Sequence, residues 1–180
     1  MTRTELAKRI VAASFLTGRF KLRSGKTSSF YLDKYRFESA PAMLAAIVDE
    51  MTALLPKEFD RLAGMELGGV PLATAISLRT GKPCLFVRKK AKEYGTCNLV
   101  EGCFARGERA VVIEDVITTA GQVGTSIEEM RALGIQVSQV ICAIDREEGG
   151  RENLAKLGCA LMPVFTWREL SAGQDTGGQK

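Results

Sequence analysis

Apolar residues recur with helical spacing in three stretches of the chain. The first stretch predicts a helix over about residues 3–16, and the second predicts a stronger helix that begins near Pro41, where proline suits the first turn. The third predicts a helix that ends at Gly134, because glycine commonly terminates helices. The positions that define these patterns are Leu6, Ile10 and Ala13; Leu44, Ile47, Val48, Met51 and Leu55; and Val123, Ile127, Met130 and Leu133.

Short apolar runs of strand length lie between and beyond these helices, and most of them do not alternate with polar residues. Continuous runs of this kind are typical of strands that helices cover on both faces. A further helix is predicted over Pro71–Leu78, between the first two runs. The alternation of runs and helices predicts an α/β fold with a mainly parallel central sheet and flanking helices. The runs are Leu62–Met65, Cys84–Val87, Ala110–Ile113, Val137–Ile144 and Ala160–Phe165.

Two segments and the C-terminal end depart from this alternation. Phe20–Asp33 places polar and glycine residues between β-prone segments, which predicts a hairpin or hood near an edge of the sheet. Arg88–Gly102 is polar and contains two glycines, so we expect a mobile loop there. We expect a frayed tail over residues 171–180. Residues 1–180 therefore form one predicted domain, with residues 1–40 contributing the hood.

The composition excludes several kinds of chemistry. The chain has no histidine, which rules out Ser-His-Asp and Cys-His catalysis and any imidazole base. Its five cysteines lack C-x-x-C spacing, so we expect free thiols rather than a zinc ribbon or a redox motif. The formal net charge of +4 fits an anionic small ligand and does not require nucleic acid as a partner.

The chain is expected to be cytoplasmic and to have no membrane partner. Apolar residues make up 46% of it and charged residues 26%, as in ordinary globular proteins. No apolar stretch approaches the ~20 residues that span a bilayer. The first residues, Met1–Glu5, include an acid and lead into an amphipathic pattern, unlike a secretory signal.

Val111–Val123 is the segment that carries candidate chemistry. It begins as a buried strand, places Glu114 and Asp115 at the carboxyl end of that strand, and continues through a small turn into a helix. Open α/β sheets bind their ligands at this end of the strands. Backbone N–H groups of the turn and the hydroxyl groups of Thr118 and Thr119 can surround a phosphate, and the helix dipole assists.

The two halves of this segment offer complementary subsites. The carboxylates can accept hydrogen bonds from a diol or hold a hydrated metal, and the turn can hold a phosphate monoester. A ribose 5-phosphate has both features at that separation, and an adjacent carboxylate would stabilise a cationic, oxocarbenium-like sugar. The alternative is an aspartate that caps a threonine-rich helix, which would explain Asp-x-x-Thr-Thr but not the whole pattern.

Val111–Val123 resembles the phosphoribosyl-pyrophosphate (PRPP) signature of type I phosphoribosyltransferases. Within that group the chain resembles the orotate phosphoribosyltransferase family from about Phe20 to Arg146. The resemblance implies the type I fold, and it implies that Asp115 is catalytic. It assigns PRPP binding to Glu114, Asp115, Val116, Ile117, Thr118, Thr119, Ala120, Gly121 and Gln122.

The densest basic cluster, Arg88–Gly95, follows a predicted strand. A short basic run is most often solvated surface, but on a glycine-bearing loop it can close over a pyrophosphate leaving group and exclude water. The cluster resembles the catalytic loop of the orotate family, which implies that Arg88, Lys89 and Lys92 contact pyrophosphate in the partner subunit's site of a homodimer. Tyr94 stands where the bacterial loop usually has histidine, so Lys92 is the candidate general acid.

Two further segments resemble the family, although a tight strand-to-helix connection and an ordinary edge hairpin would explain them as well. In the segment that resembles the pyrophosphate loop, Leu67 and Gly68 stand where many relatives carry Tyr-Lys, so one ligand charge is missing. In the hood, Arg23 stands where lysine is usual, with a different donor geometry. Tyr31 and Leu32 match the aromatic pair that covers the base, with one ring missing.

Arg146 ends a predicted buried strand inside a charged cluster. Such an arginine is more often part of a surface ion pair. In the family pattern, however, Arg146 pairs with the carboxylate of the base, a contact that suits the fork of a guanidinium group. A purine has no carboxylate for it to hold, so Arg146 favours orotate. The resemblance also assigns Thr118 to the orotate subsite.

The leading hypothesis is an enzyme of pyrimidine (UMP) biosynthesis that joins orotate to PRPP and releases pyrophosphate and orotidine 5′-phosphate. Mg²⁺ is the expected cofactor, because a diphosphate leaving group needs charge compensation beyond three basic side chains. No direct protein ligand is assigned to it, and Glu114 and Asp115 could reach it through water. Two alternatives stay open, transfer to another base and a PRPP-sensing regulator without turnover, and the basic loop disfavours the second.

Overall fold

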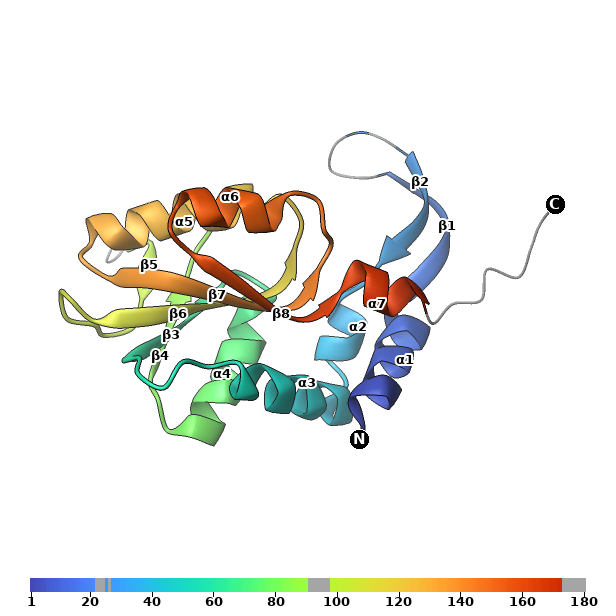
Figure 1. Ribbon diagram of the computed structural model, residues 1–180, viewed down its shortest axis with the longest axis horizontal. Helices are drawn as coiled ribbons and strands as arrows, with labels where there is room; N and C mark the ends of the chain where they lie inside the picture. Colours follow the sequence, from blue (N-terminus) through green and yellow to red (C-terminus); the bar gives the residue numbers. More distant parts are fainter. Residues whose placement is uncertain (22–24, 26, 91–97, 173–180) are drawn as a thin grey trace.

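The computed structural model describes residues 1–21, 25, 27–90 and 98–172, and in this part of the chain a six-stranded sheet carries helices on both faces (Figure 1). The strands stand in the order β5-β4-β3-β6-β7-β8, and all neighbours are parallel except β4 and β5. The predicted α/β fold with a mainly parallel sheet is confirmed. The strands are β3 (Arg61–Met65), β4 (Cys84–Val87), β5 (Val100–Glu101), β6 (Arg109–Ile117), β7 (Gln136–Asp145) and β8 (Ala160–Thr166).

The two longest strands, β6 and β7, are neighbours in the interior of the sheet, and their apolar runs are long because both faces are covered. Val112, Ile113, Val140 and Ile141 are 0% exposed. Each such side chain stabilises the fold by about 1.5–3 kcal/mol relative to an exposed one. This buried pair of strands therefore provides a rigid base for the residues that follow β6.

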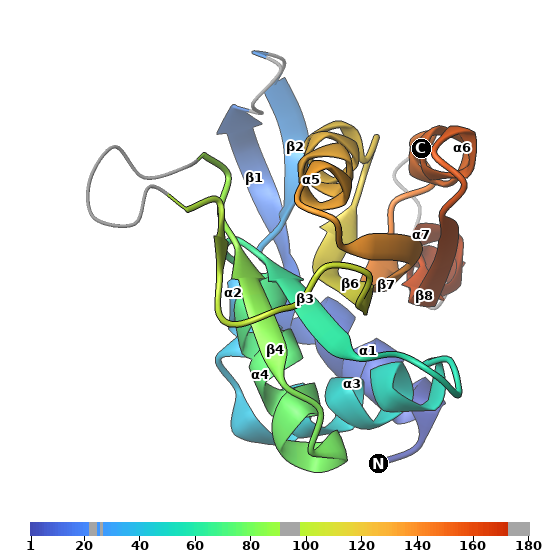
Figure 2. The same cartoon turned by 90° about the vertical axis from the view of Figure 1, so that its left-hand side faces the viewer.

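Two layers of helices cover the sheet, with α3 and α4 on one face and α5 and α6 on the other (Figures 1 and 2). Each layer packs on its own apolar cluster, one around Ile47 and Ile76 and the other around Ile127 and Leu154. No helix in the described part of the chain combines the length and the apolar character that a membrane crossing needs. The four helices are α3 (Pro41–Ala53), α4 (Gly69–Thr80), α5 (Gly121–Ala132) and α6 (Gly150–Lys156).

The predicted hood is an antiparallel hairpin of β1 (Phe15–Lys21) and β2 (Thr27–Leu32) that stands apart from the main sheet (Figure 1). Three helices surround its base: α1 (Arg3–Ser14), α2 (Tyr35–Glu38) and α7 (Trp167–Ala172). The chain therefore reaches the hood from α1 and returns from it through α2 into the body of the protein.

The structure corrects the predicted start of the hood. The first helix ends at Ser14 rather than at residue 16, because Phe15 already pairs with Leu32 in the hairpin. The hairpin accordingly starts at Phe15 and not at Phe20. Helical periodicity continued past the true end because these residues are apolar in both elements.

The predicted loop and the predicted tail each contain regular secondary structure at one end. Arg88–Gly102 is not loop throughout, because Val100 and Glu101 pair antiparallel with β4 as strand β5. Ser171 belongs to α7 rather than to a frayed tail. Residues 91–97 and 173–180 lie outside the described residues.

One further correction concerns β6, which continues to Ile117 although the predicted strand stops at Ile113. Its pairing with β3 ends at Ile113, but its pairing with β7 continues to Ile117. From β3 the sheet continues through β4 in one direction, and from β6 it continues through β7 in the other. The strand order therefore reverses between β3 and β6, where ligands bind in open α/β sheets.

Candidate substrate-binding site

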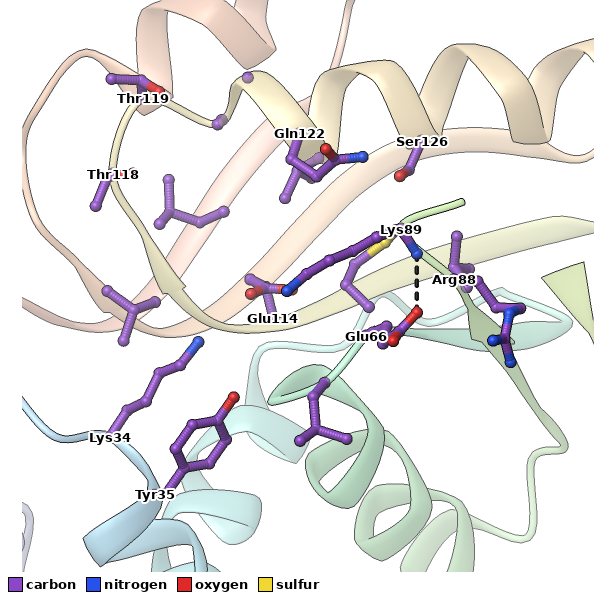
Figure 3. A pocket seen from close by; sticks show the side chains of 18 residues that line it. Lys34, Tyr35, Glu66, Arg88, Lys89, Glu114, Thr118, Thr119, Gln122 and Ser126 are labelled. Carbon is purple, nitrogen blue, oxygen red and sulfur yellow. Dashed lines mark hydrogen bonds between the residues drawn. The ribbon is translucent and has the colours of Figure 1, made fainter. Parts of the chain in front are cut away.

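A pocket lies at the carboxyl ends of β3, β4 and β6, beside the point where the strand order reverses (Figure 3). Its walls come from the connection between β3 and α4, the segment after β4, the connection between β6 and α5, and the start of α2. The lining residues are Lys34, Tyr35, Met65, Glu66, Leu67, Val87, Arg88, Lys89, Glu114, Val116, Ile117, Thr118, Thr119, Ala120, Gly121, Gln122, Val123 and Ser126.

The turn between β6 and α5 forms one wall of the pocket. Ala120 precedes α5 in the left-handed region at φ 58°, and no side chain caps the helix. The first N–H groups of α5 are therefore free to bind an anion, and the helix dipole favours one there. The amide of Asn153 on α6 donates to the carbonyl oxygen of Thr119 at 3.0 Å and so supports the turn from behind. The geometry suits a phosphate group.

Glu114 lies within β6 and lines the pocket. It is 9% exposed, and its Oε2 atom has no hydrogen-bond partner among the described residues. Burial, followed by the neighbouring Asp115 carboxylate, raises the pKa of Glu114 well above its usual range. A cation or a hydrogen-bond donor that enters the pocket would favour the ionised form.

Asp115 is fully buried, and three neighbours fix its carboxylate. Its Oδ1 atom accepts a hydrogen bond from the backbone N–H of Val116 at 2.5 Å. Its Oδ2 atom lies 2.5 Å from the Nζ atom of Lys34. The same oxygen lies against Gly68, because a Cβ atom on Gly68 would be 1.4 Å from it. Asp115 thus connects β6, the start of α4 and the segment that follows the hood.

A second buried acid, Glu38, follows Lys34 by one helical turn and is 5% exposed. Burial, with a further contribution from the Asp115 carboxylate, raises the pKa of Glu38 to about 8. Burial by itself would lower the pKa of Lys34, but Asp115 and Glu114 outweigh it and raise that pKa. At neutral pH, Lys34 is therefore the charged partner of Asp115, and Glu38 carries a proton.

Arg88 and Lys89 follow β4 directly, and both line the pocket. The backbone N–H of Arg88 donates to the carbonyl oxygen of Leu99 at 2.9 Å, and that of Lys89 donates to Oε2 of Glu66 at 3.0 Å. The Lys89 side chain runs across the pocket in the direction of Glu114 (Figure 3). The pocket thus has two basic residues in the segment after β4, and of these the Lys89 side chain crosses the pocket.

The pyrophosphate-loop residues divide between the pocket and the layer behind it. Leu67 is 57% exposed and lines the pocket, whereas Gly68 precedes the first residue of α4 behind it. The Glu66–Leu67 peptide bond in this connection is cis. Three further residues singled out from the sequence, Arg23, Lys92 and Tyr94, lie outside the described residues.

Arg146 follows β7, and its backbone N–H donates to the carbonyl oxygen of Ile117 at 2.8 Å, beside the turn after β6. Its side chain forms an ion pair with Glu148 at 3.1 Å. Its guanidinium group lies over the Trp167 ring, 4.7 Å from the centroid, with the Phe30 ring at 6.0 Å. Arg146 is not among the residues that line the pocket, so its contact with a base stays a prediction.

The hood residues expected to cover a base have different environments. Tyr31 is 45% exposed and stacks on Phe20 with a centroid distance of 5.6 Å. Leu32 is 8% exposed and packs in the core, so Tyr31 is the accessible member of the pair. The ring of Phe30, which the sequence did not single out, stacks on Trp167 at 5.8 Å.

Sequence patterns do not single out four polar residues of the pocket: Lys34, Tyr35, Glu66 and Ser126. Ser126 could have been found, because it follows Gln122 by four residues on the same helix. Glu66 lies inside the segment that resembles the pyrophosphate loop, but no spacing distinguishes it. Lys34 and Tyr35 have no local signal, because only the return of the chain from the hood brings them to the pocket (Figure 3).

Comparison with known proteins identifies relatives along nearly the whole chain, although no family model matches it. A protein named orotate phosphoribosyltransferase from Nocardioides sp. is 51% identical over 172 residues, which cover 96% of each chain. A protein of the same name from Methanocella arvoryzae is 42% identical over 166 residues, which cover 92% of this chain and 94% of the relative.

Solved structures give the same result. The crystal structure of orotate phosphoribosyltransferase from Aeropyrum pernix has a TM-score of 0.86 at 33% identity and covers 96% of this chain and 99% of its own. The Mycobacterium tuberculosis H37Rv orotate phosphoribosyltransferase in complex with PRPP has a TM-score of 0.79 at 29% identity and covers 94% and 98%. The acidic end of β6 and the turn that suits a phosphate lie beside the point where the strand order reverses, and the identities extend over nearly full lengths. The protein therefore belongs to the orotate phosphoribosyltransferase family.

Proposed function

We propose that this protein transfers the 5-phosphoribosyl group of PRPP to orotate and releases pyrophosphate and orotidine 5′-phosphate, as a step of pyrimidine biosynthesis. The bond between the ribose C1 atom and the pyrophosphate oxygen breaks, and a ring nitrogen of orotate bonds to C1 as its proton leaves. The observation that carries the proposal is the joint position of Glu114 and the uncapped turn after β6 in one pocket of a family member, with Asp115 buried next to Glu114.

Each wall of the pocket matches one part of PRPP. The free N–H groups at the start of α5, with the hydroxyl groups of Thr118 and Thr119, suit the 5-phosphate. Glu114 suits the ribose hydroxyl groups, and its carboxylate, with that of the adjacent buried Asp115, would stabilise positive charge as it develops on the sugar. Arg88 and Lys89, on the facing wall, suit the diphosphate, whose charge grows as it leaves.

Mg²⁺ is part of the proposal because the leaving diphosphate carries more charge than two or three basic side chains compensate. Among the described residues, the acidic and cysteine side chains form no group of three or more that could hold a metal ion. Glu114, with a buried oxygen that lacks a partner, fits a cation that arrives with PRPP. When bound, Mg²⁺ would supply charge neutralisation at the diphosphate.

Orotate recognition is assigned to Arg146, with Thr118 and the exposed ring of Tyr31. A guanidinium group can bind a carboxylate through two parallel hydrogen bonds. Glu148, at 3.1 Å, holds the Arg146 side chain in the absence of the base, and an orotate carboxylate would replace that partner. The proposed active form is a homodimer in which Lys92 of the basic loop reaches the partner subunit's site. The cytoplasmic location expected from the sequence stays a prediction.

One assay tests the reaction. The purified protein is incubated with PRPP, Mg²⁺ and orotate, uracil, hypoxanthine or adenine in parallel, and consumption of each base is followed. We expect consumption of orotate alone. Consumption of another base but not of orotate would refute the proposed acceptor, and PRPP binding without any turnover would indicate a regulator.

Variants of Arg146 test the base subsite. Arg146→Ala should raise the orotate KM by about tenfold or more with little change in the PRPP KM, because a charge-assisted pair is lost. Arg146→Lys should have an orotate KM close to that of Arg146→Ala, because an ammonium group cannot form the bidentate pair. Unchanged orotate kinetics in Arg146→Ala would contradict the assignment.

A further inference from the structure

Lys34 reaches the pocket from a part of the chain that none of the substrate-binding motifs includes. It lies between β2 of the hood and α2, and its side chain extends from there into the pocket (Figure 3). The aromatic ring of Tyr35 flanks its ammonium group, with 5.4 Å between Nζ and the ring centroid. The ammonium group therefore occupies the wall opposite the phosphate-type turn.

The contact between Lys34 and Asp115 uses only part of the ammonium group. The Nζ atom forms an ion pair with the Asp115 Oδ2 atom at 2.5 Å, and the Lys34 side chain keeps 29% of its surface exposed. An ammonium group has three N–H donors. Donors that Asp115 does not use face the pocket, where Arg88, Lys89 and the start of α5 also present groups that bind anions.

The charges around this contact show why a cation is needed here. Glu114 lines the pocket, and two further buried acids, Asp115 and Glu38, lie next to this contact without lining the pocket. Glu38 carries a proton at neutral pH, because its pKa is raised to about 8. PRPP is strongly anionic, and an unpaired buried carboxylate would repel it. Among the described residues, Lys34 is the cation in ion-pair contact with any of these acids. Lys34 therefore offsets the charge of the Asp115 carboxylate and presents a positive group to PRPP on this side of the pocket.

We propose that Lys34 is a PRPP-binding residue, whose ammonium group holds the Asp115 carboxylate in place and donates its remaining hydrogen bonds to the anionic substrate. This inference rests on the proposed function, since it names a further contact of the same substrate. It also gives the hood a second role, because the segment that returns from the hood carries the cation into the site.

The test is a direct measurement of PRPP binding by isothermal titration calorimetry, with Mg²⁺ in the buffer and without orotate. Lys34→Met should raise the Kd for PRPP about tenfold or more, as expected when a hydrogen bond to a charged group is lost. Lys34→Arg keeps the charge, and its Kd for PRPP should lie between the values of the wild type and Lys34→Met. A Kd for Lys34→Met equal to that of the wild type would overturn the proposal.

Lys57→Met is the matched control, because it removes the same charge from an exposed lysine that precedes β3, at the end of that strand remote from the pocket. It should leave the Kd for PRPP unchanged. A loss of affinity in Lys57→Met as large as in Lys34→Met would show an effect of net charge alone and would overturn the assignment to Lys34.

A second comparison removes the possibility that Lys34→Met fails only because it leaves Asp115 buried without a partner. In an Asp115→Asn background no such charge remains, so Lys34→Met is tested there as well. A direct contact predicts a further rise in the PRPP Kd from the single Asp115→Asn variant to the double variant. Equal Kd values for those two proteins would mean that Lys34 acts only through Asp115, and the direct contact would be refuted.

The wild-type protein is assayed for orotate consumption in the same experiment. PRPP binding without orotate consumption would refute the proposed reaction, and the Kd values would still decide the role of Lys34. A wild-type protein that binds no PRPP would refute both.

Discussion

At the scale of single residues, the ionisable side chains of Lys34, Asp115, Glu38 and Glu114 lie close together, and each affects the protonation of its neighbours. Glu38 lies beside Asp115, and Asp115 contacts Lys34. Two acids in this group, Glu38 and Glu114, have raised pKa values, and burial is the largest cause for both. Burial and the Asp115 carboxylate keep the proton on Glu38, whose pKa is raised to about 8.

Glu38→Gln should change the pH dependence of stability. In the wild type, Glu38 keeps its proton up to about pH 8 when folded and only to about pH 4.5 when unfolded. The folded state thus binds more protons between these values, and this group makes the protein less stable as pH rises through the window. Glutamine has the shape of the protonated acid and no titration, so the free energy of unfolding of the variant should fall less between pH 5 and 8. Urea unfolding at several pH values measures this, and parallel curves for both proteins would contradict the prediction.

Trp167 is the only tryptophan of the chain, and it supports the residue expected to bind orotate. Trp167→Leu removes the ring over which the Arg146 guanidinium group lies at 4.7 Å. Since a cation–π contact contributes about 0.5–2 kcal/mol, the orotate KM should rise about two- to thirtyfold, with the PRPP KM nearly unchanged. Trp167→Phe keeps a ring and should stay close to the wild type in steady-state kinetics. Equal orotate KM values for the leucine and phenylalanine variants would show that the ring does not position Arg146.

At the scale of elements, the site depends on how closely the start of α4 approaches β6. Gly68 has φ −66° and ψ −30°, values that any residue adopts, so its backbone conformation does not require glycine. The requirement is steric, because the Asp115 Oδ2 atom occupies the position of a side chain at Gly68. A lysine at this position would not fit unless Asp115 or the start of α4 moved. Lys34 supplies a positive charge at this contact instead.

Gly68→Ala should therefore lower kcat/KM by about tenfold or more, because the new Cβ atom displaces the Asp115 carboxylate from Lys34. Gly81→Ala, at the other end of α4, is the control. Its φ of 69° strains an alanine, but no atom lies within 4 Å of the added Cβ. The control should have a lower Tm than the wild type and an unchanged kcat/KM. A Gly68→Ala enzyme with wild-type kcat/KM would contradict the steric argument.

At the scale of the whole molecule, the order of the strands creates the site. Residues that are far apart in the sequence meet because β3, β4 and β6 end at the same edge, beside the point where the order reverses. The hood adds Lys34 and Tyr35 from the opposite side. A second subunit would add Lys92 if the basic loop works across a dimer, as proposed.

Mixed dimers test that arrangement. Differently tagged Lys92→Ala and Asp115→Asn chains are each expected to be nearly inactive as homodimers. When they are co-expressed, the mixed dimer has one site with both defects and one with neither. About half of the dimers are mixed, so roughly a quarter of the wild-type activity should return. Isolated mixed dimers without activity would refute the sharing of the loop, and a monomer in sedimentation velocity would refute the dimer.

Much of the fold and the central part of the site could be predicted because their signals are local. The buried runs of β6 and β7 and the periodicity of α3 and α5 follow from the side chains that repeat along a strand or helix. Val111–Val123 was recognisable because its acids, its turn and its helix start are contiguous, and the structure places most of the segment along the pocket. The ends of helices and strands were predicted less accurately, as at Phe15, because an apolar residue suits the end of a helix and the start of a strand equally.

The sequence by itself therefore determined the α/β class, the phosphate-type turn and the family. Only the tertiary structure decided that Lys34 is the partner of Asp115, that Gly68 leaves room for that carboxylate, and that Leu32 belongs to the core. Lys34 and Asp115 are far apart in the chain, and no periodicity relates them. Such contacts depend on the order of the strands and on the path of the chain around the hood, and a pattern of neighbouring side chains contains neither.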